Sequence, residues 1–237
     1  MIPLVSPAIV SEGILEPPVY FSQVYVRADS RFRNFGDLQG SKLAYNCEAS
    51  LSGFHCLKFF VQSYAEYDSS VSLPYFSDVL RTGGHKNSVQ AVIDGRADLC
   101  SLDCNVLAEL LGSEVGKEKM AQLRPIDIPS LTLKVVDDDG NAKVFSVSRD
   151  GLLGPNPGQP VVASTRLSPN QIKSIKQAFL EASEEVVPIP ALRGRARYVE
   201  VSAEYYDPIV LMMRATDDTR VISKKMLSTS VVLMFTI

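Results

Sequence analysis

Two serines and a glycine stand where a short apolar strand gives way to an amphipathic helix. Residues 43–46 (LAYN) predict a strand end, residues 49–53 (ASLSG) predict a turn, and a helix is expected to follow Gly53. The first N–H groups of such a helix lack partners, and its macrodipole adds about half a positive charge there. Ser50 and Ser52 add hydroxyl donors, and Gly53 allows an oxygen to approach the backbone. This pattern indicates an anion-binding site without metal or nucleophile, and it is also typical of an ordinary helix N-cap.

Two further polar residues follow expected strands. His85 lies in a Gly-Gly-His-Lys turn, where a neutral imidazole can donate one N–H to an oxyanion or bond only to local backbone. Asp103 ends the apolar run 97–102, where it can face a ligand or cap the helix expected from about Asn105. A carboxylate beside a dianion is unfavourable unless one of them carries a proton, which favours the capping role for Asp103.

The four cysteines do not form a metal-binding pattern. They contain no Cys-x-x-Cys pair, and no base flanks the two that lie closest to the serines, so we expect free thiols with no catalytic role, no metal and no cofactor. The residues concerned are Cys47, Cys56, Cys100 and Cys104.

Composition narrows the class of protein. The chain has 237 residues, with 46% hydrophobic and 22% charged residues, as in an average globular protein with one large domain or two lobes. A net charge of −3 and a pI near 5.5 argue against a nucleic-acid partner. No apolar run is long enough to predict a membrane span, and residues 1–18 lack the basic start of a signal peptide.

The order of predicted elements indicates an α/β protein with mainly parallel sheets. In such sheets ligands bind at the carboxyl ends of strands, where Asn46, His85 and Asp103 are expected. The predicted strands are 20–28, 42–46, 97–102 and 123–126, and residues 81–85 are expected to form a brief strand and a Gly-Gly turn. The predicted helices are 54–64, 74–80, 88–94 and 105–111.

The second half of the chain adds a different pattern. Two β-rich runs flank Asp-Asp-Gly-Asn and predict an antiparallel hairpin over residues 131–148. The Pro/Gly-rich segment 154–163 suggests a hinge, and Ser168 followed by proline predicts a helix start. A short helix is expected over 209–213, and the apolar run 230–237 is expected to be a last strand.

Five motifs occur in the order found in the phosphate/phosphite/phosphonate-binding proteins of ABC transporters, over roughly residues 17–182: VYFSQVYVRADS, FGDLQGSKLAYN, SLSGF, TGGHKNSVQAVIDGRADLCSLD and GPNPGQPVVASTRLS. The chain resembles this family. The resemblance implies a type II periplasmic-binding-protein fold whose two lobes close on an oxyanion, a solute-binding role without catalysis, a possible ABC permease partner, and a periplasmic or extracytoplasmic location.

The same resemblance implies the ligand-binding residues. Ser50, Ser52 and Gly53 match the turn that holds the phosphonate oxygens, and Leu51 stands where some members carry a threonine. His85 matches a histidine that reaches the ligand. The remaining matches are Tyr20, an aromatic facing the cleft; Asp103, a polar strand end; and Gln159, near the acidic residue that receives an aminoalkyl group in some members. The change at Gln159 favours phosphate, phosphite or another plain oxyanion.

The chain also departs from the family pattern. Members begin with a βαβ unit ahead of the motif at Tyr20, so we expect an incomplete lobe 1 formed by residues 1–39 and 150–237, and a lobe 2 formed by residues 40–149. The hairpin at 131–148 is an expected insertion. Two alternatives remain at this point: a truncated or degenerate relative that acts as an interaction domain, and an enzyme acting on a phosphorylated metabolite with His85 as acid/base.

Overall fold

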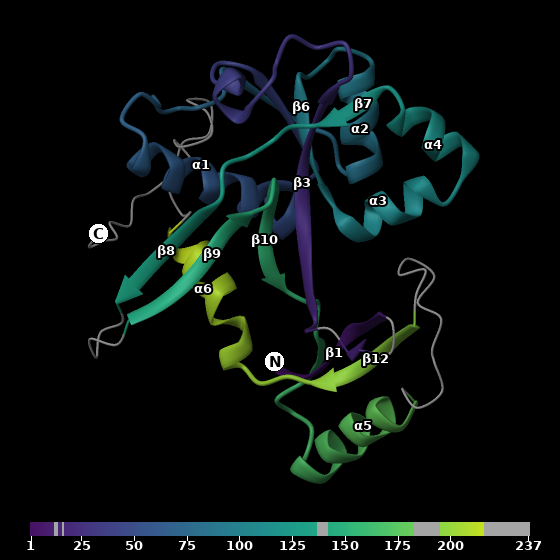
Figure 1. The fold of residues 1–237 in the computed structure, drawn as a ribbon. Helices are drawn as coiled ribbons and strands as arrows, with labels where there is room; N and C mark the ends of the chain where they lie inside the picture. Colours follow the sequence, from purple (N-terminus) through teal and green to yellow (C-terminus); the bar gives the residue numbers. More distant parts are fainter. Residues whose placement is uncertain (12–13, 16, 137–141, 183–194, 216–237) are drawn as a thin grey trace. The chain divides into compact units, whose positions relative to one another are not determined.

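A computed structural model describes residues 1–11, 14–15, 17–136, 142–182 and 195–215 (Figure 1). Contacts divide the chain into two compact units. The first unit is Met1–Tyr20 with Asn156–Val210, and the second is Phe21–Pro155 with the chain from Leu211 onward. Residues 21–39, which we expected in the first lobe, belong to the second unit, because the strand from residue 21 to residue 27 pairs with a strand of that unit.

An eight-stranded mixed sheet organises the second unit. The pairs β4–β5 and β4–β6 are parallel, as expected for strands joined by helical crossovers, whereas β3–β6, β3–β7, β8–β9 and β9–β10 are antiparallel. The order is β5 (Asp78–Arg81), β4 (Lys42–Tyr45), β6 (Leu99–Asp103), β3 (Val19–Arg27), β10 (Leu152–Pro157), β9 (Ala142–Arg149) and β8 (Leu131–Val136), with β7 (Leu123–Pro125) beside β3.

Helices cover the sheet of the second unit on both faces (Figure 1). Neighbouring residues of one strand enter different apolar clusters: Leu43 packs in the cluster that contains α1, and Ala44 packs in the cluster that contains α2. This alternation follows from the twofold repeat of a strand, and burial of both faces explains the apolar sequence of β4 and β6. The helices are η1 (Phe35–Leu38), η2 (Leu51–His55), α1 (Cys56–Tyr67), α2 (His85–Ile93), α3 (Cys104–Leu111) and α4 (Glu114–Met120).

The antiparallel hairpin predicted over 131–148 is present as β8 and β9. Its register pairs Leu133 with Phe145, and α1 contacts both strands. Residues 137–141, which contain the predicted turn, lie outside the described part of the chain.

The first unit contains a smaller antiparallel sheet. Its main order is β11 (Val161–Ala163), β1 (Ile2–Ser11) and β12 (Arg195–Glu200), and β2 (Ile14–Leu15) pairs with β1. Helix α5 (Pro169–Ala182) packs on this sheet through Ile172 and Phe179, and Ser168 caps it as predicted, with Oγ 3.3 Å from the N of Gln171. The sequence analysis did not anticipate β1. The chain continues through η3 (Glu204–Tyr206) and α6 (Asp207–Ala215), and the strand expected over 230–237 lies outside the described residues.

The prediction of a helix over 74–80 is wrong. Residues 71–77 are irregular, and β5 begins at Asp78 and pairs with β4 in parallel. The reason is tertiary: Tyr75 and Phe76 are both fully buried, and the Tyr75 hydroxyl donates to the carbonyl oxygen of Phe35 at 2.6 Å. Of the brief strand and Gly-Gly turn predicted over 81–85, the strand lies earlier, because β5 ends at Arg81. Gly83 and Gly84 do connect it to α2, which begins at His85.

Replacing Tyr75 by phenylalanine should destabilise the second unit. The Tyr75→Phe change leaves the buried Phe35 carbonyl without its donor, so the free energy of unfolding should fall by about 1–3 kcal/mol. Urea denaturation followed by circular dichroism measures this loss. Tyr25→Phe is the matched control, because its hydroxyl bonds only to the half-exposed side chain of Gln23, which can take a water instead. Equal losses for the two variants would contradict the role given to the Tyr75 hydroxyl.

Candidate functional site

The helix that carries the candidate site begins earlier than predicted. Leu51 to His55 form one π-helical turn, η2, which runs directly into α1, so Ser52 and Gly53 lie within the first turn. Ser50 is the N-cap. Its Oγ accepts a hydrogen bond from the N–H of Gly53 at 3.1 Å and another from Asn46 Nδ2 at 2.8 Å. The cap explains the early start, because the serine side chain satisfies a helix N–H that the backbone leaves open.

Gly53 is required by its neighbour at the strand end. A Cβ on this residue would lie 2.2 Å from Asn46 Oδ1. Asn46 cannot readily move away, because it donates to Ser50 Oγ and accepts from the N–H of Cys47 at 2.9 Å. The absence of a side chain at Gly53 therefore lets the end of β4 close against the start of the helix.

A chain of hydrogen bonds joins three separate elements at the same place. Ser52 Oγ lies 3.2 Å from His85 Nε2, and His85 Nδ1 lies 3.2 Å from the carbonyl oxygen of Ser101. The Ser101 hydroxyl donates back to the carbonyl oxygen of Ser52 at 2.8 Å. The start of α1, the start of α2 and the carboxyl-terminal part of β6 are thereby tied together, so the structure brings Ser50, Ser52, Gly53 and His85 into one cluster.

The geometry around His85 fixes the direction of these bonds. A backbone carbonyl only accepts, so Nδ1 carries the hydrogen that faces Ser101. Burial lowers the pKa of His85 below 6.5. The charge of Asp103 and the hydrogen bond to Ser101 raise this pKa, but their effects are smaller, so the ring is neutral at pH 7. Its single N–H is used on Ser101, so in this arrangement His85 has no N–H left for a further acceptor.

Three donors remain at the start of the helix. Helix geometry leaves the N–H groups of Leu51 and Ser52 without an acceptor inside the helix. The half-buried Ser50 accepts two hydrogen bonds and retains its own hydroxyl hydrogen. Some family members carry a threonine where this chain has Leu51. The leucine lacks the threonine hydroxyl, but the backbone N–H of residue 51 is present with either side chain. Together with the helix macrodipole, these groups suit one oxygen cluster of a small anion.

Asp103 caps a helix, the role favoured by the sequence. It is 5% exposed, and its Oδ1 accepts from the N–H groups of Asn105 at 2.6 Å and Val106 at 3.3 Å. Its carboxylate is therefore committed to the start of α3, and its effect on the cluster is the electrostatic one on His85.

Two residues implied by the family resemblance lie in the first unit. Tyr20 is buried in β3, with 6% of its surface exposed. The side chain of Gln159 is exposed, and the backbone carbonyl oxygen of this residue accepts a hydrogen bond from Ser6 Oγ at 3.2 Å. Their parts in ligand binding stay predictions.

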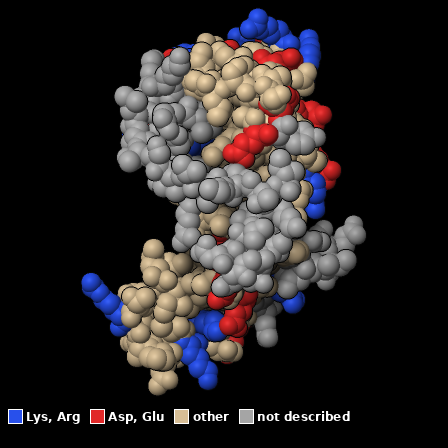
Figure 2. Space-filling model, turned by 90° about the vertical axis from the view of Figure 1, so that its left-hand side faces the viewer, with Lys and Arg blue, Asp and Glu red and all other residues tan. Residues whose placement is uncertain are grey.

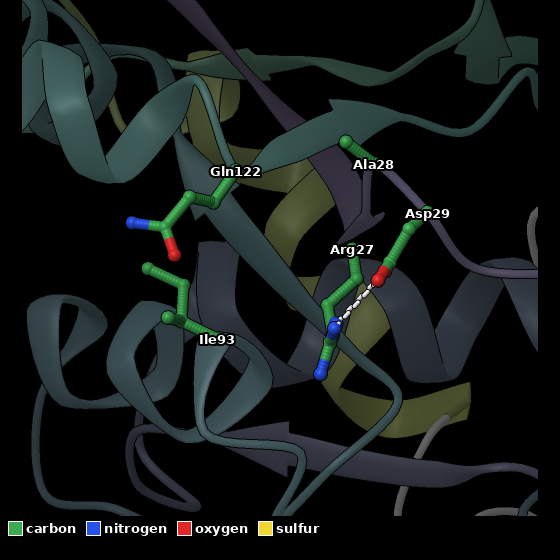
Figure 3. A pocket seen from close by; sticks show the side chains of 5 residues that line it. All are labelled: Arg27, Ala28, Asp29, Ile93 and Gln122. Carbon is green, nitrogen blue, oxygen red and sulfur yellow. Dashed lines mark hydrogen bonds and ion pairs between the residues drawn. The ribbon is translucent and has the colours of Figure 1, made fainter.

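A separate hollow in the second unit lacks the serine and histidine side chains of the cluster. It is lined by Arg27, Ala28, Asp29, Ile93 and Gln122 (Figure 3). The charged groups satisfy each other through an exposed ion pair of 2.6 Å between Arg27 and Asp29. Ile93 ends α2, whereas His85 begins it, so this hollow lies at the other end of that helix.

The remaining observations concern metals, membranes and charge. Among the described residues, no three His, Cys, Asp or Glu side chains are grouped so as to hold a metal ion. No helix in the part of the chain that the structure describes is long and apolar enough to cross a membrane. On the face shown in Figure 2, acidic and basic side chains lie next to one another in several places, and neither sign covers the face.

The fold is that of the type II periplasmic-binding proteins. A family model described as "ABC transporter, phosphonate, periplasmic substrate-binding protein" matches residues 3–206. The chain belongs to this family, whose members are non-catalytic components of ABC transporters. A comparison with curated protein sequences found no match.

Solved structures share this fold at low sequence identity. A binding-protein component of an ABC phosphonate transporter from Pseudomonas aeruginosa has a TM-score of 0.62 and 16% identity, over 90% of this chain and 62% of its own. A Xanthomonas citri protein bound to a chloride ion has a TM-score of 0.59 and 14% sequence identity, and the match covers 90% of this chain and 69% of that protein. PhnD1 from Prochlorococcus marinus, in complex with methylphosphonate, has a TM-score of 0.54 and 12% sequence identity, and the match covers 89% of this chain and 71% of PhnD1. The chain therefore spans less than two thirds of the length of the Pseudomonas protein.

Two residues of the cluster carried no signal for binding in the sequence. Ser101 lies inside a run that indicates only a buried strand, and its backbone and hydroxyl partners are visible only in the folded chain. Asn46 was expected at a strand end, but its bond to Ser50 was not anticipated.

Placing a methyl group at Gly53 should disrupt the cap. Gly53→Ala forces Asn46 from its bonds to Ser50 and Cys47, so the free energy of unfolding should fall by about 1–3 kcal/mol in urea denaturation. The control is Gly84→Ala at the start of α2, where the new Cβ meets only Asn87 Nδ2 at 3.8 Å and should cost no more than about 1 kcal/mol. Equal stability of the two variants would show that the Asn46 side chain can move away from a Cβ at residue 53 without cost, which would contradict this prediction.

Acidification should destabilise the protein through its two histidines. Burial is the largest cause of a lowered pKa at both His55 and His85, so the unfolded chain binds more protons than the folded chain as pH falls through 6.5. The contribution of the two histidines to the free energy of unfolding should therefore decrease from about pH 7 to about pH 5. Urea denaturation across this range measures the slope, and His55→Gln should reduce it. A flat profile in the unmodified chain would contradict the burial of neutral imidazoles.

Proposed function

We propose that the chain binds a small tetrahedral oxyanion of phosphorus at the start of α1, as the substrate-binding component of an ABC transporter. The observation that carries this proposal is the N-capped helix start at Ser50, where two backbone N–H groups and one hydroxyl hydrogen have no partner in the helix. These donors match the ionised oxygens of phosphate, phosphite or an alkylphosphonate, which accept hydrogen bonds.

The surroundings support binding rather than reaction. Both ring nitrogens of His85 are engaged, by Ser52 and Ser101. Asp103 Oδ1 is occupied in capping α3. Membership of a non-catalytic family agrees with this arrangement.

The ligand class follows from charge and from the relatives. PhnD1 was solved with methylphosphonate, which has the tetrahedral oxygens that the helix start of this chain would receive. By resemblance Gln159 stands near the acidic residue that pairs with an aminoalkyl group in some members. The uncharged amide of Gln159 offers no partner for an ammonium group, which supports phosphate, phosphite or a simple alkylphosphonate as ligand. An ABC permease would be the partner that receives it.

Two N-cap serines allow a matched test. Ser50 Oγ accepts from Gly53 N at 3.1 Å, and Ser113 Oγ accepts from Gly116 N at 3.1 Å at the start of α4. Ser50→Ala and Ser113→Ala should each lower the free energy of unfolding by about 1 kcal/mol. Only Ser50→Ala should weaken anion binding, by about tenfold or more, because it removes a hydrogen bond to a charged group.

Isothermal titration calorimetry with phosphate, phosphite and methylphosphonate measures the binding, and circular dichroism shows that each variant is folded. Heat from at least one anion, lost in Ser50→Ala and kept in Ser113→Ala, is the expected result. No heat from any of the three with the folded, unmodified chain would refute the proposal, and so would equal affinity in both variants.

A further inference from the structure

Within the described residues, the chain passes between the two compact units at three places. The first unit ends at Tyr20, resumes at Asn156 and ends again at Val210, and each of these boundaries falls inside a regular element. Strand β3 is the first connection, strand β10 is the second, and helix α6 is the third. A change in the arrangement of the units has to bend these connections, because they carry the chain from one unit to the other.

Hydrogen bonds join the three connections on the side of the first unit. The N–H of Gly158, next to the second connection, donates to the carbonyl oxygen of Pro18, next to the first. The Tyr205 hydroxyl donates to the same oxygen at 3.0 Å, and the Tyr206 hydroxyl donates to the carbonyl oxygen of Gly158 at 3.0 Å. Both tyrosines belong to η3, which runs directly into α6. The start of the third connection is thereby fastened to the other two.

The same junction is closely packed. A Cβ on Gly158 would lie 2.5 Å from the Pro18 carbonyl oxygen and 2.7 Å from Ser6 Oγ, so this approach of the two connections requires a glycine. The rings of Tyr205 and Tyr206 meet edge to face, with centroids 5.4 Å apart. The Pro18 oxygen accepts two hydrogen bonds, which use both of its lone pairs.

The far part of α6 is anchored inside the second unit. Met212 is buried in the apolar cluster that also contains Val24 of β3 and Leu153 of β10, the strands of the other two connections. A helix rises by about 1.5 Å per residue, so α6 cannot stretch between its two anchored ends. Its length is therefore fixed while the units move.

We propose that residues 205–212 form a hinge strut, a stiff third connection that the Tyr205 and Tyr206 hydroxyls fasten to the two strand connections, so that all three bend as one element. Two neighbouring strands alone can bend and twist in several directions, whereas a third connection of fixed length removes some of these motions. The hinge strut thus limits the arrangements that the two units sample. This proposal concerns the motion of the units and does not depend on which anion the chain binds.

Distances between two spin labels measure this motion. One label is attached to each unit of the full chain, at Ser174→Cys on the exposed side of α5 and at Glu118→Cys on α4. The half-buried cysteines are removed by Cys47→Ser and Cys104→Ser. Double electron–electron resonance, recorded without any anion, gives the distribution of distances between the labels, and circular dichroism shows that each labelled variant is folded.

Release of either end of the hinge strut should widen this distribution. Tyr205→Phe combined with Tyr206→Phe keeps both rings and removes both hydroxyls, so the distribution should become at least about twofold wider. Met212→Ala releases the other end and should have a similar effect. The triple variant should be no wider than either, because a strut that is free at one end no longer restrains the units.

Tyr198→Phe is the matched control in the first unit. The Tyr198 ring packs on Phe179, and its hydroxyl has no hydrogen-bond partner in the part of the chain that the structure describes, so the distribution should stay unchanged. Should the double tyrosine variant not fold, Tyr206→Phe alone takes its place, because it still separates α6 from the second connection.

The outcomes separate a strut from a merely local role of the two hydroxyls. An unchanged distribution in the folded tyrosine variant would overturn the proposal, even if its stability in urea fell. Additive widening in the triple variant would also overturn it, since the two ends of α6 would then act independently. Because no anion is present, either result leaves the oxyanion-binding function standing.

Discussion

The candidate site depends on one constraint: polar groups at the ends of buried strands must find partners inside the fold. Ser101 lies in a strand buried on both faces, and its two polar groups are satisfied by His85 and Ser52, which begin two different helices. These bonds hold the first turns of α1 and α2 against β6. These bonds offset the desolvation of the strand end. They also determine where the N–H groups at the helix start lie.

Local dipoles, rather than net charge, give the site its character. The chain is acidic overall, with a net charge of −3, yet the carboxylates beside the cluster are engaged. Asp103 caps α3, and Glu48 accepts from the Tyr45 hydroxyl at 2.7 Å and pairs with Arg81 at 3.3 Å. What remains near the start of α1 are backbone N–H groups and one hydroxyl hydrogen, which are fixed in place and lose little freedom when an anion arrives. Burial lowers the pKa of His85, so its ring adds no permanent positive charge to the cluster at neutral pH.

Several features could be predicted from local sequence. The apolar periodicity gave the helices α1, α2 and α3 and the strands β4 and β6, and Asp-Asp-Gly-Asn between two β-rich runs gave the hairpin. The order of motifs gave the family. Other features required contacts between distant residues. Tyr75 and Phe76 resemble part of a helix in sequence, but their burial under η1 makes the segment irregular. The segment 1–11 contains prolines, and its place as a central strand depends on pairing with β11 and β12 at the far end of the chain.

The sequence by itself determined that a serine-capped helix follows a buried strand and that His85 follows a Gly-Gly turn, because residue type and spacing specify caps and turns locally. Only the tertiary structure decided that Ser52 meets His85 across 33 positions and that Ser101 meets Ser52 across 49. It also decided that Asp103 serves a helix and that the ring hydrogen of His85 belongs to Ser101. The reason is that a hydrogen bond has a direction and a partner, and both are set by which strand ends and helix starts the sheet brings together.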